Sequence, residues 1–243
     1  MIPLLKPDWI IPGQVHACST TRNGGVSQAP YDTLNLGDHV GDDAGLVLQN
    51  RQRLSRQLGF GNDVVWLEQV HGTDVLTLDK AWPNQCRADA SYSRTPGQVC
   101  AIMTADCLPV LFCSVEGNEV AAAHAGWRGL QAGILEKTLA HFAAEPANIV
   151  AWLGPAIGPQ QFEVGGEVRD AFINVSPQAE RAFIARGDKY LADIYMLARQ
   201  RLNALGIKQV YGGDYCTVSQ PELFFSYRRE QTTGRMASMI WFD

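Results

Sequence analysis

The sequence predicts an α/β (α+β) fold in one layered domain with mixed β-sheets. Many short strand-like runs, each bounded by Gly, Pro, Asn or Asp, alternate with a few stretches of helical periodicity along the 243 residues. Gly and Pro occur along the whole chain rather than at one boundary, so we expect a single domain over residues 1–243. The long stretches between strands favour mixed rather than purely antiparallel sheets.

The expected strands are short runs rich in apolar and β-branched residues. In chain order they are Val15–Thr20, Val64–Val70, Val75–Leu78, Val99–Thr104, Val110–Val115, Val120–Ala123, Ile149–Leu153, Gln209–Gly212, Phe224–Tyr227 and Met236–Phe242.

The expected helices have apolar residues at the i, i+3, i+4 and i+7 spacing that places them on one face. They are Val47–Leu58 with Asp42 or Asp43 as N-cap, a helix after Arg128 that carries Leu130–Phe142, Glu167–Phe172, and Leu191–Leu205.

Composition limits the classes of partner. The chain is 46% hydrophobic and 19% charged with a net charge of −5, which suits an ordinary globular core and argues against a nucleic-acid binder, because such a protein needs a basic surface. No apolar run reaches the length of a membrane helix, and the first residues do not resemble a signal peptide. Six cysteines are too few for a disulfide scaffold. We therefore expect a cytoplasmic protein, monomeric, that binds neither nucleic acid nor membranes.

Three segments combine a metal-ligating side chain with turn residues at the end of an expected strand. They are residues 68–72 with His71, residues 104–109 with Cys107, and residues 124–129 with His124. Two imidazoles and one thiolate suit Zn²⁺, and three protein ligands leave a fourth position open, as in catalytic zinc sites. Asp106, next to the cysteine, would act as a general base or orient a ligand. The alternative for each segment is structural: a hydrogen-bonded loop histidine, or a cysteine used in packing.

The same segments resemble the signature blocks of a known family. Residues 69–72, 104–109 and 124–129, together with residues 21–27, 34–37, 152–158 and 225–229, are similar to the blocks of proteins once called multicopper polyphenol oxidases or laccase-domain proteins. Bacterial members of this family are described as purine nucleoside phosphorylases, and the resemblance covers essentially the whole chain.

This resemblance implies a fold, a cofactor and an activity. The fold is a layered α-β-β-α arrangement similar to the catalytic domain of cytotoxic necrotizing factor. His71, Cys107 and His124 match the zinc-binding residues. The implied reactions are phosphorolysis of adenosine, inosine, guanosine and methylthioadenosine to the free base and ribose 1-phosphate, and deamination of adenosine. The older copper-oxidase name does not fit, because five histidines cannot supply a blue-copper site and further coppers as well.

Phosphorolysis requires contacts to phosphate and to the nucleoside. Arg22 precedes a Gly-Gly turn, and Arg128 stands at the start of an expected helix, so within the family blocks these are the preferred phosphate or substrate contacts. Asn35 and Gln69 are candidate amide contacts to ribose or base. The structural alternatives are surface ion pairs for the arginines and bracing of a turn for Gln69.

Three function classes remain open from the sequence. The first is the zinc nucleoside enzyme, in which zinc polarises a ligand or lowers the pKa of bound water to about 7. The second is a cysteine hydrolase or amidase, with Cys107 as nucleophile and His124 or His71 as base, a role linked in some relatives to editing of cell-wall precursors. The third is a module that binds metal or nucleoside without turnover.

Overall fold

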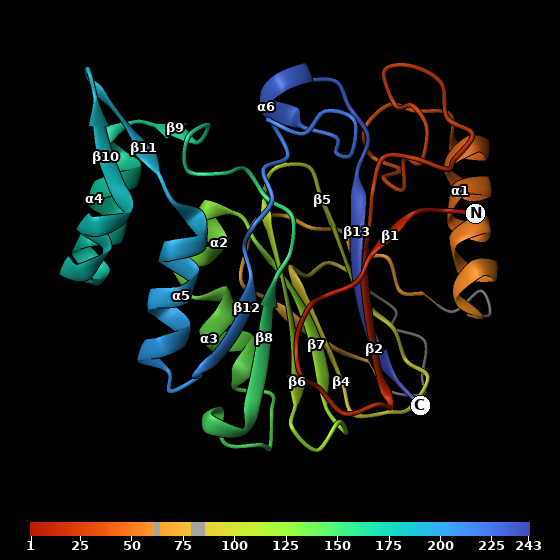
Figure 1. Ribbon diagram of the computed structural model, residues 1–243, viewed down its shortest axis with the longest axis horizontal. Coiled ribbons are helices and arrows are strands. Elements are labelled where there is room, and N and C mark those ends of the chain that lie inside the picture. Colours follow the sequence, from red (N-terminus) through yellow and green to blue (C-terminus); the bar gives the residue numbers. More distant parts are fainter. Residues whose placement is uncertain (61–63, 79–85) are drawn as a thin grey trace.

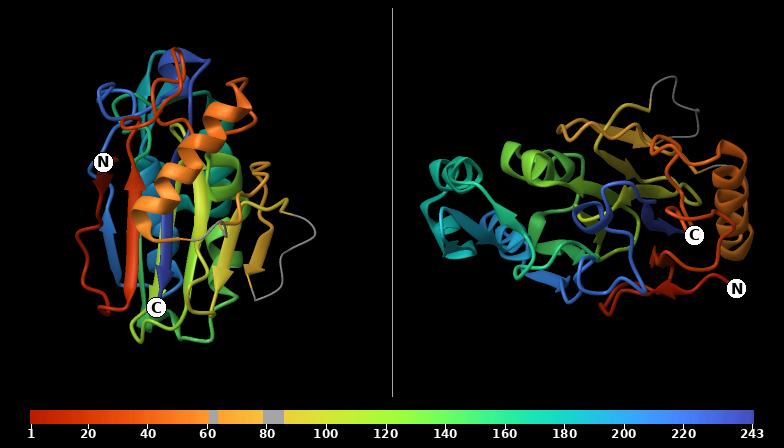
Figure 2. Two further views of the ribbon diagram at one scale, coloured as in Figure 1. Left: turned by 90° about the vertical axis from the view of Figure 1, so that its right-hand side faces the viewer. Right: turned by 90° about the horizontal axis from the view of Figure 1, so that it is seen from above.

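Two β-sheets pack face to face in the middle of the molecule, and helices cover both outer sides (Figure 1, Figure 2). The computed structural model describes residues 1–60, 64–78 and 86–243. The resulting order of layers is α-β-β-α, as the family resemblance implies.

The larger sheet has six strands and mixed direction. Its order is β12 (Gln209–Gly212), β8 (Ile149–Leu153), β6 (Leu108–Ser114), β7 (Val120–Ala125), β4 (Ala90–Ser93) and β3 (Val75–Leu78). The outer pairs β12–β8 and β3–β4 are parallel, and the pairs between them are antiparallel.

The second sheet is antiparallel and has four strands. Its order is β1 (Leu4–Leu5), β2 (Val15–Thr20), β13 (Met236–Phe242) and β5 (Cys100–Thr104). Helix α1 (Ala44–Leu58) packs on the outer side of this sheet through Leu54. Asp43 is the N-cap of α1, since its side chain accepts a hydrogen bond from the Leu46 amide at 3.0 Å.

The central strands are buried on both faces, which explains their continuous apolar sequences. In β6, Val110 and Phe112 belong to the core under the helices, whereas Leu111 and Cys113 belong to the core between the two sheets. Alternation along the strand therefore separates two cores rather than a core and solvent.

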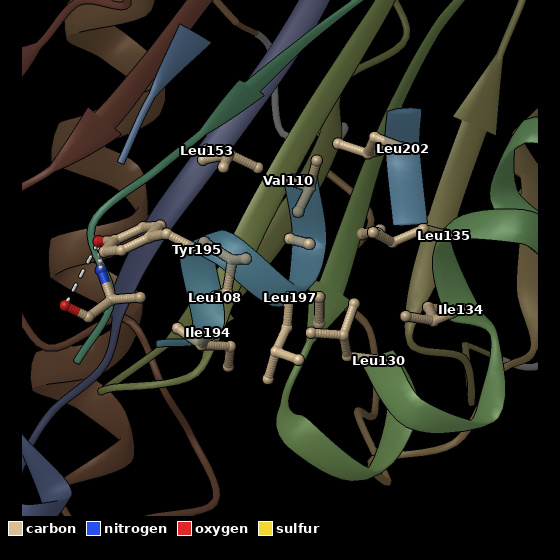
Figure 3. Close-up of a cluster of buried hydrophobic side chains, with 14 of the residues drawn as sticks. Leu108, Val110, Leu130, Ile134, Leu135, Leu153, Ile194, Tyr195, Leu197 and Leu202 are labelled. Carbon is tan, nitrogen blue, oxygen red and sulfur yellow. Dashed lines mark hydrogen bonds between the residues drawn. The ribbon is translucent and has the colours of Figure 1, made fainter. Parts of the chain in front are cut away.

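Helices α2 (Trp127–Ala132), α3 (Ile134–Leu139) and α5 (Ile194–Ala204) cover the outer face of the larger sheet. In Figure 3, Leu130, Ile134 and Leu197 from these helices point toward Leu108 and Val110 of β6.

A third, small sheet lies beyond these helices. It has the order β10 (Phe183–Arg186), β11 (Lys189–Ala192) and β9 (Glu163–Val164), and it projects from one side of the molecule together with α4 (Gly166–Val175) (Figure 1). The remaining elements are the short helices η1 (Pro146–Asn148), η2 (Pro177–Ala182) and α6 (Tyr227–Glu230).

Two expected strands are wrong. Residues 64–70 bury Val65 and Leu67, but their only pairing among the described residues is the bridge between Glu68 and Arg87. In the segment 224–227, Phe224 and Phe225 fill a small core between loops, and Tyr227 already begins α6. Burial of alternate or adjacent apolar residues thus occurs here without a partner strand.

Two helix boundaries also differ from the prediction. The helix expected after Arg128 is divided into α2 and α3 by Gly133, whose φ of 99° ends the first helix. Leu191 lies in β11, and α5 begins only after Asp193, whose carboxylate caps the Met196 amide at 2.9 Å. Among the helices of the described ranges, none is long and apolar enough to cross a membrane.

Tyr195 links two loops at the end of the larger sheet. Its ring lies in the core of Figure 3, its hydroxyl oxygen accepts the Ala156 amide at 2.8 Å, and its hydroxyl donates to the Tyr215 carbonyl at 2.9 Å. The loop after β8 is thereby joined to the loop after β12.

We expect Tyr195→Phe to lower the free energy of unfolding by about 1–3 kcal/mol, because it leaves the buried Ala156 amide without a partner while keeping the ring. Urea denaturation measures this change. Tyr211→Phe is the control, since the structure gives the Tyr211 hydroxyl no hydrogen bond to any described residue, and it should change stability by less than about 0.5 kcal/mol. Equal stability of both variants would contradict the role given to Tyr195.

Candidate functional site

Three side chains that can ligate a metal ion meet at one end of the two central sheets. The ligand atoms of His71, Cys107 and His124 all lie within 4.8 Å of one another. The Cys107 Sγ is 3.8 Å from the His71 Nε2, and the two imidazole rings lie edge to face at a centroid distance of 4.7 Å. Within the described part of the chain, this is the one group of three or more such side chains.

The strand register brings two of these ligands together. Cys107 immediately precedes β6, and His124 stands in β7 opposite Pro109 of β6. Gly126 closes the loop after β7 against them, because a Cβ there would lie 3.0 Å from the Cys107 Sγ and 3.1 Å from the His71 Cδ2. Even a methyl group at this position would press against the Cys107 and His71 side chains.

Asp89 joins the turn that carries His71 to the ring of His124. Its carboxylate is fully buried and accepts the backbone amides of His71 at 2.8 Å and Gly72 at 2.7 Å. The same carboxylate accepts the Val70 amide at 3.2 Å and the His124 Nδ1 at 2.8 Å. The turn that carries His71, which has a φ of 59°, is therefore wrapped around Asp89, and the ring of His124 is oriented by the same group.

Charge compensation sets the protonation of the cluster. Burial alone would raise the pKa of the Cys107 thiol, but the charge and hydrogen bonds of His124 and His71 lower it to about 6. Burial would lower the pKa of His124, yet Cys107 and Asp89 raise it to about 9. Burial works against ionisation of Asp89 as well, and its hydrogen bonds from His124 and Gly72 outweigh it and lower its pKa. A thiolate at neutral pH is the form that binds metal or attacks a carbonyl.

The donor set fits a metal ion. A thiolate and two imidazole nitrogens are available, and a histidine whose other nitrogen is bonded to a carboxylate is the usual arrangement of metal-ligating histidines. The open side of the group faces a cavity of about 440 Å³.

Asp89, and not Asp106, makes the hydrogen bond that orients a ligand side chain. Asp106 lines the cavity, and its expected role as a general base stays a prediction. The carboxylate of Asp106 accepts the Thr217 hydroxyl at 2.5 Å, the Ser226 hydroxyl at 3.1 Å and the Arg228 amide at 2.7 Å. It thus joins the loop before β6 to two C-terminal loops and makes no hydrogen bond to His71, Cys107 or His124 among these contacts. The positive φ of 87° at Asp106 is held by these bonds.

The cavity contains some of the substrate contacts expected from the sequence. Its lining includes the metal-ligating group and side chains from several loops. Those used below are Gln69, Trp127, Arg128, Tyr227, Arg228 and Arg235. The amide of Gln69 is bonded to the backbone nitrogen and oxygen of Met103, both at 2.8 Å, so it braces its turn.

Arg22 and Asn35 lie outside this lining, in contrast to the expected contacts. The Arg22 guanidinium donates to the carbonyls of Asp32 at 3.0 Å and Pro221 at 3.1 Å, and it pairs with Glu230 at 3.3 Å. Asn35 is fully buried, and its side chain is bonded to Gly37, Asp42 and the Arg235 amide. Their hydrogen-bonding groups are occupied by the protein itself.

Sequence reasoning missed Asp89 and Arg235. Asp89 precedes β4, whose sequence Ala-Ser-Tyr-Ser has a single large side chain and gave no strand signal, although the strand is fully buried. An acidic residue directly before this short run is the one signal that could have indicated a buried carboxylate. Arg235 follows Thr-Thr-Gly and has no motif around it.

Comparisons with known proteins give a consistent result. The family model described as multi-copper polyphenol oxidoreductase laccase matches residues 16–243. An Escherichia coli (strain K12) protein named purine nucleoside phosphorylase YfiH is 63% identical over 241 residues, which cover 99% of each chain. A Haemophilus influenzae protein named purine nucleoside phosphorylase is 52% identical, with 98% of this chain and 99% of its own covered.

Solved structures agree with the fold. The Neisseria meningitidis protein NMB0706 superimposes with a TM-score of 0.96 at 50% identity over 99% of both chains. YlmD from Geobacillus stearothermophilus gives a TM-score of 0.87 at 34% identity, covering 95% of this chain and 92% of its own.

We expect Asp89→Asn to weaken zinc binding about 10- to 100-fold, because the amide removes the charge that orients His124 and turns one acceptor into a donor. Competition with a chromophoric chelator measures the affinity. Asp43→Asn, which keeps a capping side chain on α1, is the matched control and should bind zinc as the parent protein does. Folded Asp89→Asn protein with unchanged affinity would show that Asp89 does not position the ligands.

Proposed function

The chain belongs to the multi-copper polyphenol oxidoreductase laccase family, and we propose that it is a zinc-dependent purine nucleoside phosphorylase. It would convert adenosine, inosine, guanosine or methylthioadenosine and phosphate to the free base and ribose 1-phosphate, and also deaminate adenosine. The observation that carries this proposal is the His71–Cys107–His124 group at the floor of an arginine-lined cavity. The names of the relatives support the reaction class.

Zinc suits this donor set better than a group of copper ions. Several coppers would need additional imidazoles, and the structure brings only His71 and His124 together with a thiolate in its described residues. Of the other three histidines, His16 stacks on Trp241 and His141 lies beside Thr77. His39 lines the same cavity, but its Nδ1 lies 3.5 Å from an Asp38 carboxylate oxygen and it is not part of the metal-ligating group.

In this proposal, different residues bind the metal ion, orient its ligands and contact the purine. Bound zinc would supply a positive charge that polarises a substrate oxygen and stabilises developing negative charge. His71, Cys107 and His124 would hold it, and Asp89 keeps the His124 ring in one orientation. Trp127 and Tyr227 line the cavity and would supply aromatic surface for a purine.

Arg128 is the residue that we assign to phosphate at the helix side of the cavity. Its guanidinium lies 4.5 Å from the centre of the Trp127 ring, and no carboxylate among the described residues pairs with it. An arginine in this state can give two parallel hydrogen bonds to a phosphate. Arg22, whose donors are bound to the protein, is not assigned this role.

A second function is favoured by one observation. Cys107, His124 and Asp89 form a line of nucleophile, base and orienting carboxylate, as in cysteine hydrolases. In that case Cys107 would attack an amide carbonyl and zinc would only occupy the thiolate. Such an amidase would have no requirement for phosphate.

The phosphorylase proposal predicts that nucleoside cleavage requires phosphate and releases ribose 1-phosphate. Arg128→Gln should raise the KM for phosphate about tenfold or more and the KM for adenosine much less, because a charge-assisted contact to the dianion is lost. Product analysis by chromatography with varied phosphate measures both effects. Arg56→Gln on the exposed side of α1 is the control and should leave both constants unchanged. Adenosine cleavage at full rate without phosphate would exclude the phosphorylase.

A further inference from the structure

Within the described residues, none of the arginines that line the cavity has a direct ion pair, whereas half of the twelve other arginines have one. Arg22, Arg51, Arg169, Arg186, Arg201 and Arg229 each have a carboxylate oxygen within 4.0 Å. Arg128, Arg228 and Arg235 line the cavity, and no carboxylate of the described residues lies within that distance of them. The cavity therefore holds cations whose charge the protein itself does not neutralise by a direct ion pair.

Arg235 is held by hydrogen bonds of both its backbone and its side chain. Its amide donates to the Asn35 Oδ1 at 2.9 Å, and its carbonyl accepts the Leu36 amide at 3.1 Å. Its Nη1 donates to the carbonyls of Thr233 and Gly234, both at 3.0 Å. The Nε and Nη2 atoms have no acceptor among the described residues, so one edge of the guanidinium fork is unused.

Gly37 forms the support of this side chain. A Cβ at residue 37 would lie 2.8 Å from the Arg235 Cγ and 3.2 Å from its Cβ. The arginine stem thus occupies the space that a side chain at residue 37 would fill. This contact fixes the direction of the guanidinium without contributing any charge.

The positive charge of Arg235 is only partly compensated by the groups around it, so a bound anion would stabilise it. Burial lowers the pKa of the Arg235 guanidinium, and the negative charges of Cys107 and Asp106 raise it but do not fully compensate. Holding a half-buried cation without a direct partner is unfavourable, and a bound anion would remove that cost. Because the chain carries a net charge of −5, an anionic ligand has to be attracted by local cations of this kind.

We propose that Arg235, together with Arg128, forms a subsite for a phosphate dianion. Arg235 directly precedes β13 of the four-stranded sheet, whereas Arg128 belongs to α2 on the other layer. The two arginines therefore reach the same cavity from different layers, and in this proposal one phosphate contacts both. That the ligand is inorganic phosphate, used as co-substrate, rests on the proposed phosphorylase function.

The test is the binding of inorganic phosphate to the zinc-loaded protein, measured by isothermal titration calorimetry. Arg235→Gln should weaken binding about tenfold or more, since a hydrogen-bonded charge is removed. Arg235→Lys should recover only part of this loss, because a point charge replaces the planar fork. Gly37→Ala keeps every charge and displaces the Arg235 stem, so it should also weaken binding, by about threefold or more.

Arg94→Gln provides a control with the same change of charge. Arg94 is exposed and follows the end of β4 remote from the site, because Ala90 at the other end pairs with Ala123 beside His124. It should bind phosphate as the parent protein does, and zinc content and circular dichroism should be unchanged in all variants. Unchanged phosphate affinity in both Arg235→Gln and Gly37→Ala would overturn the subsite.

Failure of the subsite and failure of the phosphorylase proposal give different results. Phosphate-dependent release of ribose 1-phosphate with an unaltered phosphate KM in Arg235→Gln would overturn the subsite alone.

A second titration, with adenosine 5′-monophosphate and with adenosine, identifies whether the bound phosphate is free phosphate or part of a phosphate ester. Monophosphate binding at least tenfold tighter than that of adenosine, and lost in Arg235→Gln, would overturn the assignment to free phosphate in favour of a phosphate ester. Equal affinities of the two nucleosidic ligands would support free phosphate.

Discussion

The carboxylate of Asp89 is the group on which the geometry of the site depends. It accepts three consecutive backbone amides from the turn of His71, and it also binds the ring of His124. One buried anion thus positions two of the three metal-ligating side chains, His71 and His124. The buried carboxylate is stable there because each of its two oxygens accepts two hydrogen bonds, and because protonated His124 places a positive charge beside it.

The pairing of the strands fixes the remaining geometry of the site. The pairing of β6 with β7 fixes Cys107 beside His124, and the absence of a side chain at Gly126 lets the ligands approach. β6 and β7 are buried on both faces, by helices on one side and by the second sheet on the other, so the strands that position these ligands are held by two cores. The cavity then opens where loops from both layers meet, with Arg128 from one layer and Arg235 from the other.

Much of this arrangement follows from the sequence, and the remainder depends on contacts between distant segments. Apolar runs predicted the central strands, and turn residues at their ends predicted His71, Cys107 and His124 as ligands. Asp89 could not be found in this way, because it is followed by small and polar residues that form a strand only between β7 and β3. The Gly-Gly turn after Arg22 indicated a phosphate contact, but the donors of Arg22 are bound to the Asp32 and Pro221 carbonyls. Which arginine is unpaired is a property of the folded protein.

The central claim is that one zinc ion is bound by one thiolate and two imidazoles. X-ray absorption at the zinc edge of the purified protein tests it directly. The account predicts a single sulfur at about 2.3 Å and nitrogen ligands at about 2.0–2.1 Å, with the multiple-scattering features of two imidazole rings. Loss of the sulfur contribution in Cys107→Ala would assign it to this residue. A coordination shell with no sulfur, or with several sulfurs, would contradict the claim.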